Sequence, residues 1–176
     1  MNDGNEHTDD MELINLEHVR GVLEEYAQAV RNLYQDNLIR SDRIASGDLL
    51  NSVEYRVIQD GTEYEVQLSL AEYWKYVEYD TKPHWPPVSA IREWIRVKPV
   101  LPRPDANGRI PTPQSLAFLI GRKISREGTE GSHDLERAID AVNREYRDKL
   151  VIALSQDTDT LMKVIVGEIR GSLTQG

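Results

Sequence analysis

Residues 73–87 place the strongest constraint on how this chain folds. Four tyrosine or tryptophan side chains fall within residues 73–79, and three prolines follow within residues 83–87. Aromatic side chains favour burial of large apolar areas, while the polar groups of Tyr and Trp need partners. Each proline fixes its own φ and biases the preceding residue towards an extended conformation. The segment predicts a short aromatic element followed by a rigid loop, suited to making the same contact in many copies of the chain.

Length and composition limit the class of protein. A chain of 176 residues is long enough for one domain with its own core, and the lack of cysteine excludes disulfides and thiolate metal sites. No apolar run approaches the roughly 20 residues of a membrane-spanning helix, and the N-terminus lacks the pattern of a signal peptide. We expect a soluble protein with no membrane partner. Its parts would be a flexible acidic arm (1–10), a single domain (11–154) and a helical C-terminal extension (155–176).

The hydrophobic periodicity predicts an α+β fold, in which a long N-terminal helix and C-terminal helices pack on a small antiparallel sheet. Apolar residues at helical spacing predict a helix over residues 13–40. Apolar and polar residues alternate over residues 53–59 and 63–70, on either side of an Asp60-Gly61 turn. This pattern is typical of a β-hairpin.

Two short helices are expected next, over residues 71–79 and 88–97. The second would bury the side formed by Ile91, Trp94 and Ile95.

The last third of the chain combines a loop with further helices. Five prolines in residues 98–113 predict a long proline-rich loop, and long loops of this kind are often functional. A helix should run from Pro113 to Gly128. Another should run from His133 to about Leu154, with residues 161–173 either continuing as helix, which we favour, or forming a strand.

The charge is distributed unevenly along the chain. Residues 82–126 hold nine Lys or Arg against two acids, or +7, which leaves −16 for the rest of a chain whose net charge is −9. This polarity favours electrostatic docking between copies or onto a partner. A solvated basic face and direct nucleic-acid binding are the alternative readings of the same residues.

Three segments, in this order, resemble the tail-component family of tailed double-stranded DNA bacteriophages, whose members are also called tail-completion or neck proteins. Residues 46–53 (SGDLLNSV) are similar to the family's Ser/Thr-Gly-x-Leu-x-x-Ser-Ile segment before its first strand. Residues 76–87 (YVEYDTKPHWPP) are similar to its Val-Glu-Tyr/Phe-Gly-Thr segment followed by a proline-rich aromatic loop. Residues 116–129 (LAFLIGRKISREGT) resemble its helix ending in Arg-x-Gly-Thr. The match covers residues 41–140.

One position departs from this pattern. Asp80 stands where the family usually has Gly, and that Gly is expected to supply a positive φ, which Asp tolerates better than most residues.

The resemblance implies a structural virion protein without catalytic activity, cofactor or metal. Such proteins form a closed homo-oligomeric ring, twelvefold or sixfold, at the head–tail junction or upper tail. The expected partners are a portal or adaptor protein, tail or tube proteins, and genomic DNA that passes through the channel without sequence-specific binding. The chain would be made in the bacterial host cytoplasm and end in the virion. A virion-associated enzyme and a nucleic-acid-binding protein that uses residues 82–126 remain alternatives.

We expect the subunit contacts to use aromatic and basic side chains of the two loops. Each aromatic could equally serve only as core or rim packing. His84 has no second His at ligand spacing, and Asp157 with Asp159 forms an incomplete cation motif, so no metal site is predicted. Asp134 is better explained as a helix cap than as a catalytic acid. The expected interface residues are Tyr76, Tyr79, Thr81, His84, Trp85, Arg103 and Arg109.

Overall fold

The computed structural model describes residues 15–174 apart from positions 62, 99 and 105, and it confirms the predicted α+β fold. Helices account for 62% of the chain and strands for 11%, so helices supply most of the packing. The arm predicted over residues 1–10 lies outside the described residues. In chain order the elements are α1 (Glu17–Arg40), α2 (Asp48–Ser52), β1 (Glu54–Asp60), β2 (Glu63–Ser69), α3 (Trp74–Glu78), α4 (Val88–Val97), α5 (Pro113–Glu127) and α6 (Asp134–Thr174).

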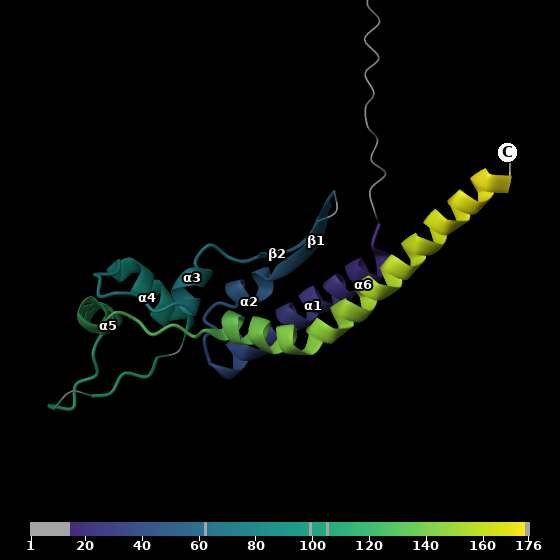
Figure 1. The fold of residues 1–176 in the computed structure, drawn as a ribbon. Helices are drawn as coiled ribbons and strands as arrows, with labels where there is room; N and C mark the ends of the chain where they lie inside the picture. Colours follow the sequence, from purple (N-terminus) through teal and green to yellow (C-terminus); the bar gives the residue numbers. More distant parts are fainter. Residues whose placement is uncertain (1–14, 62, 99, 105, 175–176) are drawn as a thin grey trace, which may run out of the picture.

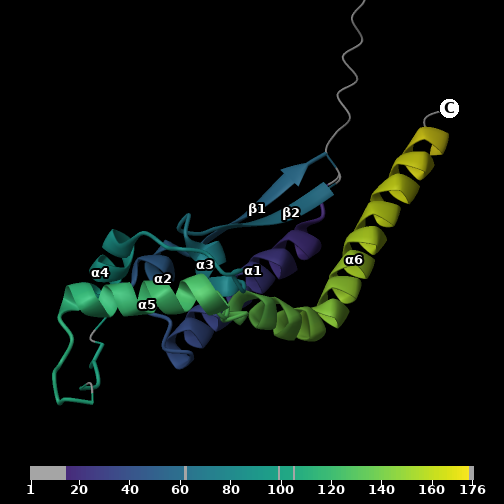
Figure 2. The same ribbon diagram turned by 90° about the vertical axis from the view of Figure 1, so that its left-hand side faces the viewer.

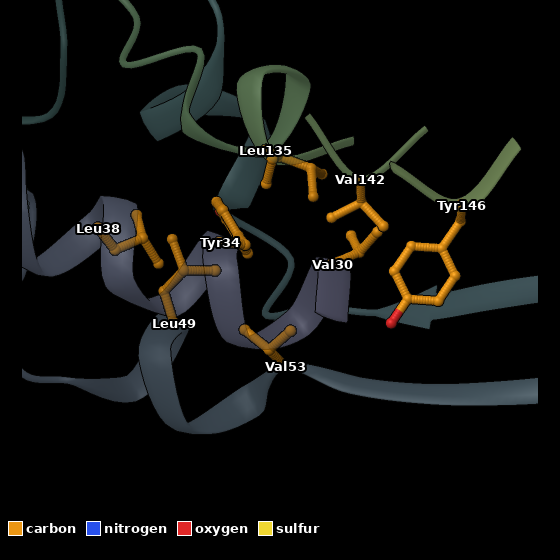
Figure 3. Close-up of a cluster of buried hydrophobic side chains, with 9 residues drawn as sticks. Val30, Tyr34, Leu38, Leu49, Val53, Leu135, Val142 and Tyr146 are labelled. Atoms are coloured by element: carbon orange, nitrogen blue, oxygen red, sulfur yellow. The ribbon is translucent and has the colours of Figure 1, made fainter. Parts of the chain in front are cut away.

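Two long antiparallel helices, α1 and α6, form the centre of the molecule and make its most extensive contact (Figure 1). Their facing sides carry apolar residues at helical spacing, so each helix buries one stripe against the other. Tyr26 and Tyr146 meet edge to face, with ring centroids 5.9 Å apart. Figure 3 shows the resulting cluster of buried side chains. Its members are Val30, Tyr34, Leu38, Leu49, Val53, Leu135, Ala138, Val142 and Tyr146.

The predicted hairpin forms a two-stranded antiparallel sheet, β1–β2, which packs on α1. Its register pairs Glu54 with Ser69 and Asp60 with Glu63, and Gly61 adopts the positive φ (59°) that this tight turn needs. Half-buried and exposed residues alternate along both strands, as expected for a sheet with one face on a helix.

Helices α4 and α5 pack against each other at one end of the molecule, with the proline-rich segment 98–112 projecting beside them (Figures 1 and 2). We call this unit, residues 79–130, the head. The predicted bounds of α4 are confirmed, and α5 begins at Pro113 with Thr112 as its cap. Gly128, at φ 76°, ends α5.

The C-terminal region is helical over residues 161–173, as favoured from the sequence, but it belongs to α6, one continuous helix from Asp134 to Thr174. The expected end near Leu154 was wrong. In the polar residues after Leu154 the backbone stays helical, and the hydroxyls of Thr158 and Thr160 donate to the carbonyls of Leu154 and Gln156, one turn earlier.

One residue of this polar segment, Asp157, stabilises the start of α1. The residue before this helix is Leu16, whose side chain offers no acceptor. The carboxylate of Asp157 on α6 instead accepts from the backbone N–H groups of His18 (3.1 Å) and Val19 (2.9 Å), and its Oδ1 lies 2.7 Å from His18 Nδ1. Asp157 is therefore a helix cap supplied from a distant part of the chain.

Burial raises the pKa of the Asp157 carboxyl, but the hydrogen bonds from Val19 and His18 outweigh it and hold the pKa below its ordinary value. The charged form is thus stabilised by folding.

We predict that Asp157→Ala lowers the free energy of unfolding by about 1–2 kcal/mol, the usual value of a lost N-cap. Because the folded-state pKa is depressed, the stabilisation is complete above the ordinary pKa and is lost as pH falls through the lower folded-state pKa. Urea unfolding of both proteins at neutral pH and at pH 3 measures the difference. Asp159→Ala, on the same turn, is the control. A gap between wild type and Asp157→Ala that does not shrink in acid would contradict the assignment.

Candidate assembly interface

Residues 76–81, which we call the aromatic turn, are joined to the start of α6 by backbone hydrogen bonds. Ser132 N–H donates to the carbonyl of Val77 (2.8 Å), and His133 N–H donates to that of Glu78 (3.0 Å). Gly131 lies so close to this turn that an added Cβ would fall 2.3 Å from the Glu78 oxygen, so only glycine fits there.

Glu78 completes this joint with its side chain. The residue is only 1% exposed, and its carboxylate accepts from the backbone N–H groups of Leu135 and Glu136, each at 3.0 Å. The carboxylate of Glu78 therefore caps α6 and meets the positive end of the helix dipole. The predicted capping role of Asp134 was wrong. That residue is the first of α6, is buried, and accepts from Ser41 Oγ (2.7 Å) and from Arg137.

A second link lies three residues after Glu78, at Thr81. Thr81 and Thr129 form an isolated antiparallel bridge, and their hydroxyl oxygens are 2.7 Å apart. Gly128 is required at this crossing, because a Cβ would fall 1.9 Å from the carbonyl oxygen of Thr81. The Arg-x-Gly-Thr segment and the aromatic turn are thus in direct contact.

Asp80 does not play the part expected for it. Its φ is not positive, so the position does not need the freedom of glycine. Its Oδ1 instead accepts from the N–H of Gly131 (2.7 Å) and lies 3.6 Å from Nε2 of His133. Asp80 therefore adds a side-chain hydrogen bond to the joint at the start of α6.

Trp85 sits on the head as a half-exposed anchor. It is 51% exposed, and its ring meets that of Phe118 on α5 edge to face, with centroids 5.5 Å apart. Pro86 beside it is buried, and α5 approaches the pair closely at Gly121, where a Cβ would lie 3.9 Å from both. The indole is fixed on one side and open to a partner on the other.

The structure separates the remaining expected interface residues into groups. Tyr76 is 70% exposed. Tyr79 is 48% exposed, and its ring contacts those of Trp74 and His133. His84 is exposed, with Nδ1 2.9 Å from the carbonyl oxygen of Lys82.

The other three interface candidates differ in exposure. The half-buried Thr81 is engaged within its own chain, through the bridge described above. Arg103 and Arg109 lie exposed on the projecting loop. Direct use of any of these residues between copies stays a prediction.

An apolar groove between α4 and α5 was not predicted from the sequence. It measures about 670 Å³, and its walls include Ala90, Ile91, Trp94, Ile120, Lys123 and Ile124. The expectation that α4 buries Trp94 was wrong, because 42% of its surface is exposed, whereas Ile91 is buried as expected. The helical spacing of these residues was visible in the sequence, but it could not show that the packing of α4 on α5 leaves Trp94 exposed beside the buried Ile91.

The basic middle of the sequence maps onto the head. Part of its charge is paired there: Arg96 binds Glu93, Lys123 lies 3.8 Å from Glu127, and Lys98 lies 3.0 Å from Asp42. Such exposed pairs contribute only about 0–1 kcal/mol each. The head, with nine Lys or Arg against five acids, keeps a net positive charge, while Lys123, Glu127 and Glu130 line the groove itself.

Among the described residues, no group of three or more His, Asp or Glu is placed to hold a metal ion. Within the same part of the chain, no helix is long and apolar enough to cross a membrane. Tyr34, deep in the core, has a pKa raised by burial and by the nearby charges of Glu78 and Asp134. Its hydroxyl therefore stays protonated and acts as part of the core.

Comparison of the chain with models of known protein families, with characterised proteins and with solved structures finds no match.

We predict that Glu78→Ala lowers the free energy of unfolding by about 2–4 kcal/mol, because it removes both acceptors from the start of α6 and leaves a cavity. Glu78→Gln keeps one acceptor and should cost less. Urea unfolding followed by tryptophan fluorescence measures the effect. The exposed neighbour Glu72→Ala is the control, and equal stability of Glu72→Ala and Glu78→Ala would contradict the role of the cap.

Proposed function

We propose that this chain is a structural subunit of a tailed-bacteriophage virion, which assembles as a closed ring in the neck or upper tail and joins the portal-side assembly to the tail. The observation that carries the proposal is the joint at the start of α6. It brings residues 76–87 and 116–129, two of the family-like segments, into direct contact. The third segment contributes Leu49 and Val53 to the core that also holds Leu135.

The use made of these segments supports a structural role. Their distinctive residues serve in backbone pairing, in capping and in close glycine contacts. A catalytic motif would instead hold reactive groups at a site open to substrate. Motifs that fix how a head is attached to a long helix suit a subunit whose shape must be the same in every copy.

The charge distribution supports assembly around DNA. A ring is built from heterologous contacts, in which one patch of each subunit meets a different patch on its neighbour. The basic head and acidic body offer two such patches. An acidic channel wall would repel the phosphates of the genome and let it slide.

One observation favours nucleic-acid binding as a second candidate. Exposed aromatic rings of Trp85 and Phe118 lie in the basic head, and basic surfaces with stacking rings can bind single strands. Salt-sensitive binding of DNA by the purified protein would support that candidate over the ring.

We predict that Trp85→Ala gives full heads with free tails, or leaking heads, while the purified variant still folds. Loss of the Trp85 ring from the subunit contact should weaken that contact by at least about tenfold, the equivalent of about 1.4 kcal/mol, and so lower the number of infectious particles. Electron microscopy and plaque counts measure the effect, and Ile39→Ala, at an exposed apolar site on α1, is the control. Intact infectious particles from a phage lacking the protein altogether would overturn the proposed function.

We predict that the projecting loop makes a contact needed for assembly. Deleting residues 103–110 should leave the subunit folded but impair particle formation, since prolines lower the ordering cost on binding and Arg103 and Arg109 offer charge. Replacing the same residues with a Gly-Ser segment of equal length tests composition separately from length. Normal particles from both variants would mean that the loop is a passive connector.

A further inference from the structure

Helix α6 carries an apolar stripe that faces solvent. On the opposite, buried side of α6, beside α1, lie Tyr146, Ala153 and Asp157, among others. At 3.6 residues per turn, the centre of the stripe lies roughly 130° around the helix from them. Its exposed members are Val151, Leu154, Met162, Ile165 and Val166.

The stripe continues beyond the body of the molecule. Asp157 binds the first turn of α1, and α6 runs on to Thr174, roughly 25 Å further at 1.5 Å per residue. Figures 1 and 2 show this part extending alone. An amphipathic helix with its apolar side in water needs a partner surface to cover it.

The groove of the head is a second apolar surface open to solvent. It is walled by Ile91, Trp94, Ile120 and Ile124 and lies between two helices. Grooves of this shape accept the apolar side of an amphipathic helix, whose anchors recur at three- and four-residue steps. Met162, Ile165 and Val166 on the stripe offer such steps.

The stripe and the groove lie at opposite ends of the molecule, so one copy cannot join its own two surfaces (Figure 1). The charges at these ends are complementary. The head, residues 79–130, holds nine Lys or Arg against five acids, whereas the other end has Asp60 and Glu63 at the hairpin turn. Opposite charge at opposite ends favours head-to-tail docking of identical chains.

We propose that the α6 stripe of one copy docks into the α4–α5 groove of the next copy. This inference rests on the proposed ring, for which it names the contact between neighbouring subunits. The contact is heterologous, so each subunit uses its groove towards one neighbour and its stripe towards the other. Covering both apolar surfaces gives the association its free energy, and the charges set its direction.

Cross-linking tests the contact in the full-length protein, which has no native cysteine. Lys123→Cys, on the groove wall, and Met162→Cys, on the stripe, are made as separate variants, mixed, and treated with a short bis-maleimide. We expect the main product to be a heterodimer in which position 123 of one chain is linked to position 162 of the other. Arg56→Cys, exposed on β1, replaces Lys123→Cys in the control mixture. A heterodimer no more abundant than in the control, or Met162–Met162 homodimers as the main product, would overturn the proposal.

Self-association provides a second measurement. Met162→Lys with Ile165→Lys places charge on the stripe, and Ala90→Trp fills the groove from an exposed position. Each should weaken self-association at least tenfold in sedimentation velocity. Gln156→Lys with Thr160→Lys adds the same charge on the opposite side of α6 and should leave it unchanged.

The outcomes separate this contact from the proposed function. A wild-type protein that stays monomeric at the highest attainable concentration overturns the contact, whereas the fate of the phage lacking the protein decides the function. Equal weakening by the stripe variant and by its opposite-side control would also overturn the contact.

Discussion

The rest of the structure depends on one buried carboxylate, that of Glu78. A charge away from water is unfavourable unless hydrogen bonds and an opposing dipole compensate it, and here two N–H groups at the start of α6 do so. Because α3 supplies the carboxylate and α6 the donors, the bond fixes where the head meets the long helices. Asp157 does the same for α1 from the other direction. Each long helix is therefore started by a residue remote from it in sequence.

Much of the fold could be predicted because its signals are local. The Asp60-Gly61 turn with alternating strands predicted the hairpin, and Pro113 with Gly128 predicted both ends of α5. The polar run before Leu161 was read as a break, because nothing local shows that its Asp157 caps another helix.

The candidate site was predicted only in part. Tyr76 and Trp85 are exposed, as a contact surface requires, and their use as an interface stays a prediction. The role of Glu78 was missed, since a glutamate in an aromatic segment is usually solvated. The α4–α5 groove was missed as well, because periodicity shows that Ile91 and Trp94 share a side but cannot show whether a neighbour covers it.

The position of the joint at Glu78 also means that a small rotation there produces a large displacement at the far end of α6. The head is attached near the first residues of α6, whose 41 residues span about 60 Å. A rotation of the head by about 5° about this joint displaces it, relative to the far end of α6, by about 5 Å at that length. In the ring proposed above, small rotations at the contact between neighbouring subunits would thus become large changes in the diameter of the ring. The caps supplied by Glu78 and Asp157 would limit such rotations and so keep the diameter of the proposed ring constant.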